Sequence, residues 1–266
     1  MSSLPIPGMD TLPLKLTVTP LLILAASLAS RRWGETVGGW FVGLPLTSAP
    51  VCFFLALDQG RGFAAAASLG CLAGAASEAG FCLAYAITAR RFGWPLALGS
   101  ASLAFAACGV LFAEGALPLW PLLALSCAAL AVALLLIPRF GDERATLLRR
   151  PRWDIPARMM VATGLVLGFT ALAPLVGARL SGLLATYPVF AAVLAAFSHH
   201  GRGPAAAVQV LRGLLIGLFG FNGFFAVLAS TIEPLGIAGS FAAATGVALA
   251  IQGCSLLLMR RPSTRH

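Results

Sequence analysis

Charged residues are scarce in this chain of 266 residues: they make up 10% of the sequence, and only nine of them are acidic. Soluble domains carry about 25% charged residues. Hydrophobic residues account for 59% of the chain, and the mean hydropathy is +0.92. A single soluble core cannot bury this much apolar surface, so the composition excludes a soluble enzyme, a nucleic-acid-binding domain and a disordered chain.

Residue groups that carry enzyme chemistry are also missing. The six cysteines lie in apolar runs without CxxC spacing, and no histidine or carboxylate accompanies them at the spacing of metal ligands. The GxSxG motif of serine hydrolases and the HExxH motif of zinc proteases are absent. We therefore expect a protein that is not an enzyme, with no catalytic residue, no metal and no cofactor. His199 and His200 are expected at a membrane surface without a role, because neighbours on a helix face different directions.

Long apolar runs are what the sequence has instead. A helix needs about 17–25 residues to cross a bilayer. Nine runs qualify, near residues 13–30, 36–57, 62–89, 94–113, 116–137, 157–176, 180–198, 204–228 and 234–258. We expect an all-α polytopic membrane protein with about nine transmembrane helices.

The basic residues orient these spans. With nine spans, fourteen lysines and arginines fall in loops on one side of the membrane, and only Lys15, Arg61 and Arg179 fall on the other. The positive-inside rule places the N-terminus outside and the C-terminus in the cytoplasm of a multi-pass protein of the inner (plasma) membrane. The net charge of +9 is thus spread over several loops rather than gathered for nucleic acid. The basic loop 138–156 either contacts anionic lipid headgroups or is a solvated loop that only sets topology.

A repeated pattern divides the chain into two halves. Four positions recur 143 residues later, and Gly-Arg-Gly occurs at both 60–62 and 201–203. The second span therefore matches the seventh and the third matches the eighth. Each pair is an odd number of spans apart, so the halves cross the membrane in opposite directions. The recurring positions are Gly70, Gly74, Gly80 and Phe81, which match Gly213, Gly217, Gly223 and Phe224.

This pattern predicts three segments. Residues 1–113 form a first membrane repeat of four spans, and residues 157–266 form a second repeat, inverted relative to the first. Residues 114–156 supply the connecting span, which inverts the second half, and the basic cytoplasmic loop.

The sequence also resembles a known family. Gly-Leu-Leu-Ala-Thr-Tyr-Pro-Val at 182–189, continuing to 197, and Gly-Leu-Pro-Leu-Thr-Ser-Ala-Pro at 43–50 resemble the second helix of the GlpM-like family. Leu184 stands where the family pattern has a proline. The resemblance implies a bacterial inner-membrane protein, here as a fused and duplicated form of a unit of about four helices. The family implies no particular substrate.

Prolines at the middle of two matched spans indicate broken helices. Proline removes a backbone donor, and interrupted helices at corresponding positions of inverted halves are a mark of a midplane substrate site. The alternative is a pair of structural kinks healed by serine and threonine hydroxyls. The expected substrate-binding residues are Pro45, Thr47, Ser48 and Pro50 in the second span, Thr186, Tyr187 and Pro188 in the seventh, and Asn222 in the eighth. Asn222 has a second interpretation, as a hydrogen-bonding contact between helices.

Two charged residues lie inside spans. Glu78 is deep in the third span, and carboxylates in such positions usually mark a pathway or an ion pair. Arg212 lies at a similar depth in the eighth span, about 13–18 Å from the cytoplasmic surface at 1.5 Å per residue. We expect the two to act in proton coupling or gating, either as a pair or with Glu78 alone. The alternative for Arg212 is that its long side chain extends to the headgroups.

Together these features predict a secondary transporter or exporter of a small or amphipathic solute, with proton coupling as one form of the mechanism. The alternative is a non-transporting accessory or scaffold protein of a cell-envelope complex. The expected partners are membrane lipids and an unidentified small solute, with a second copy of the chain as an option and no nucleic acid.

Overall fold

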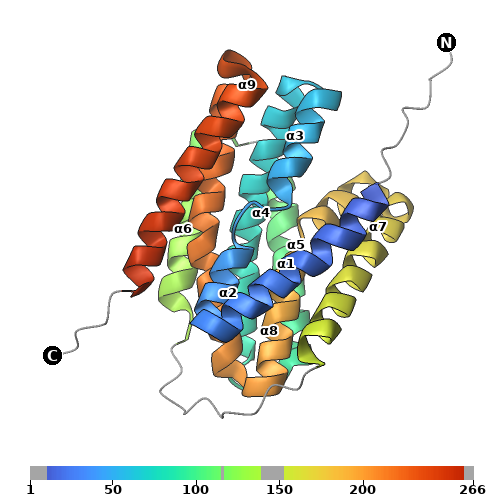
Figure 1. The fold of residues 1–266 in the computed structure, drawn as a ribbon, viewed down its shortest axis with the longest axis vertical. Helices are drawn as coiled ribbons and strands as arrows, with labels where there is room; N and C mark the ends of the chain where they lie inside the picture. The colour runs from blue at the N-terminus through green and yellow to red at the C-terminus, as the bar shows by residue number, and fades with distance from the viewer. Residues whose placement is uncertain (1–10, 115–116, 139–152, 261–266) are drawn as a thin grey trace.

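The chain folds entirely into helices over the residues that the structure describes. This computed structural model describes residues 11–114, 117–138 and 153–260, and these ranges contain nine helices and no strand. Figure 1 shows them as an upright bundle with α1 lying obliquely across one face. The helices are α1 Thr11–Trp33, α2 Glu35–Val42, α3 Ser48–Asp58, α4 Arg61–Thr88, α5 Trp94–Glu114, α6 Leu119–Leu136, α7 Asp154–Thr186, α8 Val189–Arg202 and α9 Pro204–Arg260.

Two of the predicted spans are broken where the prolines lie. α2 ends at Val42 and α3 begins at Ser48, so the interruption includes Pro45. α7 ends at Thr186 and α8 begins at Val189, with Pro188 between them. Proline has no amide hydrogen to continue a helix, and short-range bonds replace the helical ones at both places. The amide of Leu46 donates to Leu44 O, and the amide of Val189 donates to Tyr187 O, both at 2.8 Å.

Four glycines turn the chain between consecutive helices. Gly34, Gly60, Gly203 and Gly236 have φ between 72° and 95°, a region that side chains other than glycine's rarely enter. Gly236 lies inside α9 and divides it into segments 204–235 and 237–260. These two segments correspond to the predicted eighth and ninth spans.

One predicted boundary is wrong. The sixth and seventh spans were expected to separate near 177–179, but α7 runs without a break to Thr186. Arg179 interrupts the apolar run, yet an arginine keeps its backbone amide and so does not by itself end a helix. The helix ends instead just before Tyr187 and Pro188.

Helix starts in the two halves keep the spacing of 143 residues. The interruptions follow the same spacing, because Pro45 matches Pro188 rather than Pro50 matching it. The first residues of the matched helices are Thr11 and Asp154 for α1 and α7, Arg61 and Pro204 for α4 and α9, and Trp94 and Ile237 for α5 and the second segment of α9.

α4 and the first segment of α9 pack against each other in opposite directions. Arg61, at the start of α4, donates to the carbonyl of Glu233 near the end of that segment, at 3.1 Å. At the other end of α4, the Tyr85 hydroxyl lies 3.2 Å from His199 Nδ1, just before α9 begins. The matched helices therefore run antiparallel.

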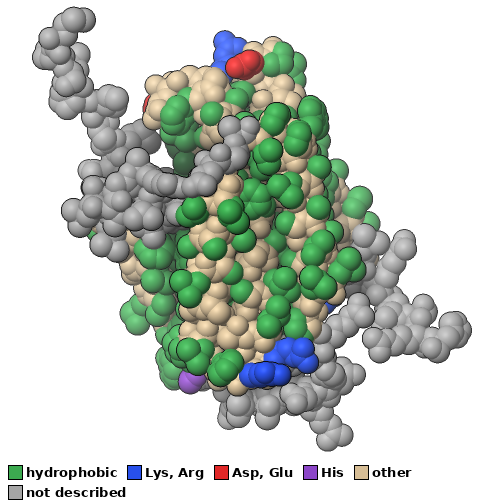
Figure 2. Space-filling model, turned by 180° about the vertical axis from the view of Figure 1, so that it is seen from behind, with side chains coloured by type: hydrophobic (Ala, Val, Ile, Leu, Met, Phe, Trp, Pro, Cys, Tyr) green, Lys and Arg blue, Asp and Glu red, His purple; other side chains and the backbone are tan. Residues whose placement is uncertain are grey.

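The outer surface suits a lipid environment. Among the described residues, α4, α5, α6 and α9 are long and apolar enough to cross a membrane. Large apolar side chains point outward from these helices, such as Leu103 (74% exposed) and Leu135 (81% exposed). Figure 2 shows hydrophobic side chains over most of one face and basic side chains gathered towards its two ends. This arrangement is typical of a helical membrane protein.

Candidate functional site

Glycines bring the first helix interruption into contact with the middle of the bundle. A Cβ added at Gly39 would overlap the Val210 carbonyl of α9, and a Cβ added at Gly213 would overlap the Thr36 carbonyl of α2. At the next turn, a Cβ on Gly43 would lie 2.8 Å from Gly217 Cα. The two helices therefore cross with their backbones in contact, as small residues spaced by four allow. This crossing holds residues 43–47 beside the first segment of α9.

The second interruption packs on α4 in a corresponding way. A Cβ at Gly74 would lie 3.4 Å from Thr186 Cβ, at the last residue of α7. Tyr187 follows, and its hydroxyl lies 2.7 Å from Ser102 Oγ of α5. Its ring makes edge-on contacts, with centroids 5.5–5.9 Å away, with Phe81, Phe105 and Phe169. Tyr187 is thus fixed on both its apolar and polar sides.

A small pocket lies between the two interruptions. Its walls come from α1, α2, the first interruption and the start of α8, and they are apolar except for Thr47. Thr47 and Phe190 face each other's helices here, so the pocket joins the first interruption to the residues just after Pro188. The lining residues are Leu22, Phe41, Val42, Leu44, Leu46, Thr47 and Phe190.

The structure places the predicted binding residues in different surroundings. Thr47 lines the pocket, whereas Pro45 and Ser48 are half-buried beside it and Pro50 is exposed on α3. In the other half, Pro188 is buried and Thr186 and Tyr187 face α4 and α5. The pocket is therefore formed by the neighbours of the predicted residues more than by those residues themselves.

Asn222 lies away from the pocket and joins two helices. Its side chain is fully buried, and Nδ2 donates to Ser126 Oγ of α6 at 2.8 Å. Of its two interpretations, the contact between helices is the one that the geometry supports. It holds the connecting helix α6 against α9.

Glu78 faces the second interruption. It lies on one stripe of α4 with Gly74, Phe81 and Tyr85, because residues separated by three or four positions share a helix face. Those three residues contact Thr186, Tyr187 and His199 respectively. Glu78 is half-buried and makes no hydrogen bond or ion pair with another described residue. In particular, no ion pair joins it to Arg212, which lies half-buried on α9.

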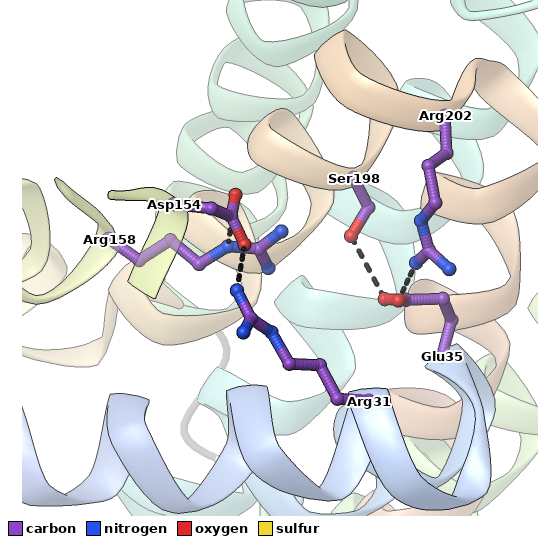
Figure 3. Close-up of polar contacts among 6 residues, drawn as sticks. All are labelled: Arg31, Glu35, Asp154, Arg158, Ser198 and Arg202. Atoms are coloured by element: carbon purple, nitrogen blue, oxygen red, sulfur yellow. Dashed lines mark hydrogen bonds and ion pairs between the residues drawn. The ribbon is translucent and has the colours of Figure 1, made fainter. Parts of the chain in front are cut away.

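A polar network that the sequence did not predict lies at the end of the bundle where the predicted cytoplasmic loops meet (Figure 3). Glu35, in the first turn of α2, is only 2% exposed. Its carboxylate accepts a hydrogen bond of 2.9 Å from Ser198 Oγ and forms an ion pair with Arg202, both on α8. The residues are more than 160 positions apart, so no local motif joins them. An acidic residue among basic loops was the one available signal.

A second part of this network joins α1 to α7. Asp154 Oδ2 lies 3.3 Å from Arg31 Nη2, and Asp154 Oδ1 lies 3.2 Å from Arg158 Nε. Arg158 is 3% exposed and its guanidinium stacks on Phe197 of α8 at 5.4 Å. His199, next along α8, contacts Tyr85. His199 thus has a structural partner, which the sequence did not indicate.

Within the described ranges, no three histidine, cysteine or carboxylate side chains are grouped so as to hold a metal ion. Comparison with known proteins gives no relative: no family model, curated protein or solved structure matches this chain. The similarity to the GlpM-like family accordingly stays a prediction from short motifs.

Proposed function

We propose that this protein is a secondary transporter or exporter of a small or amphipathic solute in the bacterial inner membrane. The observation that carries the proposal is the relation between the two interruptions. Each one packs on a glycine of the long helix from the opposite half, Gly43 on Gly217 and Thr186 beside Gly74. A site between two such interruptions can be exposed to either side by rocking one half against the other.

The proposed architecture is two inverted repeats of four spans joined by α6, giving nine spans. The common spacing of 143 residues between helix starts supports the duplication. The antiparallel course of α4 and the first segment of α9 supports the inversion.

Loop contacts support the proposed orientation, with the N-terminus outside and the C-terminus in the cytoplasm. The ion pair between Arg31 and Asp154 joins two loops that the arginine distribution assigns to the cytoplasm. The bond between Arg61 and the Glu233 carbonyl joins two loops assigned to the outside.

The pocket and Glu78 suggest the chemistry of transport. An apolar wall with one hydroxyl suits a solute that is partly hydrocarbon, because few polar groups fix the orientation of a ligand in such a pocket. Glu78 supplies the one carboxylate facing the second interruption, where a proton can bind during the cycle. Arg212 acts separately from Glu78 in this scheme.

Solute-driven proton flux tests the proposal. The purified protein is reconstituted in vesicles containing a pH-sensitive dye, and short-chain carboxylates, alkylamines and lysophospholipids are added in turn. We expect at least one of them to change the internal pH faster than in protein-free vesicles, and Glu78→Gln to abolish the difference. Flux that is identical in Glu78→Gln would remove Glu78 from the proton path, and no flux with any probe would contradict transport.

The small size of the pocket favours a second candidate, a membrane scaffold for a cell-envelope complex. Tight packing of both interruptions, as at Tyr187 and Ser102, suits a rigid platform as well as one state of a transporter. Absence of flux for every probe would favour this candidate.

A further inference from the structure

We propose that the ion pairs Glu35–Arg202 and Arg31–Asp154 form a gate that closes the pocket on the side of the predicted cytoplasmic loops. The inference rests on the proposed transport function and adds to it a residue-level mechanism of closure. Neither pair was among the predicted coupling or gating residues.

Both pairs join one half of the chain to the other. Glu35 on α2 meets Arg202 on α8, and Arg31 on α1 meets Asp154 on α7 (Figure 3). α1 and α2 precede the connecting helix α6, whereas α7 and α8 follow it. The halves therefore cannot separate at this end unless both pairs break.

The network lies between the interruptions and one end of the bundle. Glu35 begins α2, whose eight residues lead about 12 Å to the first interruption. Arg202 ends α8, whose fourteen residues extend about 21 Å from the second interruption. A solute leaving the pocket towards this end has to pass the level of the two pairs.

Burial gives the gate two defined states. The side chain of Glu35 is 1% exposed and that of Arg202 is 19% exposed. A carboxylate buried this deeply needs its cationic partner and the Ser198 hydroxyl, because an unpaired buried charge is strongly unfavourable. When the halves part, water reaches both groups and replaces the lost contacts. The paired state is then closed, and the hydrated state is open.

The opposite end has no equivalent pair. At the spacing of 143 residues, the position matching Glu35 is Ala178 and the position matching Arg202 is Gln59. The described contact at that end is a single exposed hydrogen bond from Arg61 to a main-chain carbonyl of α9. The resting protein should therefore be closed on the cytoplasmic side and open more readily on the outer side.

Thiol accessibility tests the gate without any solute. Ala195 lies on the same face of α8 as Ser198 and Arg202, one turn nearer the pocket, and is fully buried. Ala195→Cys in reconstituted vesicles is exposed to a charged, impermeant maleimide on the cytoplasmic face, and modification is followed by peptide mass spectrometry. We expect Glu35→Gln to raise the modification rate at least about tenfold, because loss of one partner shifts the population to the open state.

Arg61→Gln is the matched control, since it removes the contact at the opposite end and should leave the rate within about twofold of the parent. The exchanged pair Glu35→Arg with Arg202→Glu should restore most of the protection. Rates that stay at the parent value in both Glu35→Gln and Arg202→Gln would overturn the proposal. An equal increase in Arg61→Gln would also overturn it.

The buried natural cysteine Cys82 separates gating from unfolding. It should stay unmodified in Glu35→Gln, and modification in parallel with the reporter would show that the pair stabilises the fold instead, which would overturn the gate. The outcome for the gate is distinct from that for transport. Unchanged accessibility in a protein that moves solute would remove only the gate, whereas increased accessibility without flux would remove only the transporter.

Discussion

Gly213 and Gly70 hold matched positions in the two halves, yet their surroundings differ completely. Gly213 touches the α2 backbone, where any Cβ would overlap the Thr36 carbonyl, whereas nothing lies within 4 Å of a Cβ added at Gly70. A sequence repeat thus conserves the residue at both places while only one of them needs it. Sequence patterns indicate small-residue spacing but do not show which copy forms the close crossing.

This difference predicts opposite effects of the same substitution. Gly213→Ala should lower the free energy of unfolding by about 1–3 kcal/mol, because the added methyl group forces α2 and α9 apart. Gly70→Ala should leave it unchanged or raise it by up to about 0.5–1 kcal/mol, because alanine restricts the unfolded chain. Thermal unfolding of both variants in the same detergent measures the contrast. Equal destabilisation by the two would contradict the backbone contact.

At the scale of elements, the interruptions are the part of the fold that the sequence predicts best. Pro45 and Pro188 mark both of them, because proline leaves a helix without an amide donor wherever it stands. The expected boundary near 177–179 is wrong because it rested on charge, which reports depth in the membrane rather than helix ends. Packing partners such as Ser102 for Tyr187 are out of reach of sequence patterns, because they come from helices distant in the chain.

The second interruption should depend on the bond between Tyr187 and Ser102. Removing either hydroxyl, in Tyr187→Phe or Ser102→Ala, should weaken the anchoring of this segment by about 0.6–1.7 kcal/mol. Hydrogen exchange at the amides of Val189 and Phe190 should rise similarly in both variants, and no further in the double variant. Additive increases in the double variant would show that the two hydroxyls do not act as one contact.

At the scale of the whole molecule, the apolar surface and the ends rich in arginine follow directly from composition. The internal polar contacts do not. Glu35 and Arg202 were placed in loops by their charge, and Glu78 and Arg212 were considered as partners because of similar depth. The structure instead pairs Glu35 with Arg202 and leaves Glu78 facing the second interruption. Depth alone fixes neither the rotation of a helix nor its neighbours, and these decide which charges meet.

Alternating access of the pocket is the central claim, and labelling of Thr47→Cys from each face of the membrane tests it most directly. Thr47 lines the pocket between the interruptions, and Leu103→Cys, on the lipid-facing surface at the middle of α5, is the matched control. The account predicts that an impermeant charged thiol reagent modifies Thr47→Cys from either face, rapidly from outside and slowly from the cytoplasm, and modifies Leu103→Cys from neither. Modification of Thr47→Cys from only one face, however long the exposure, would contradict it.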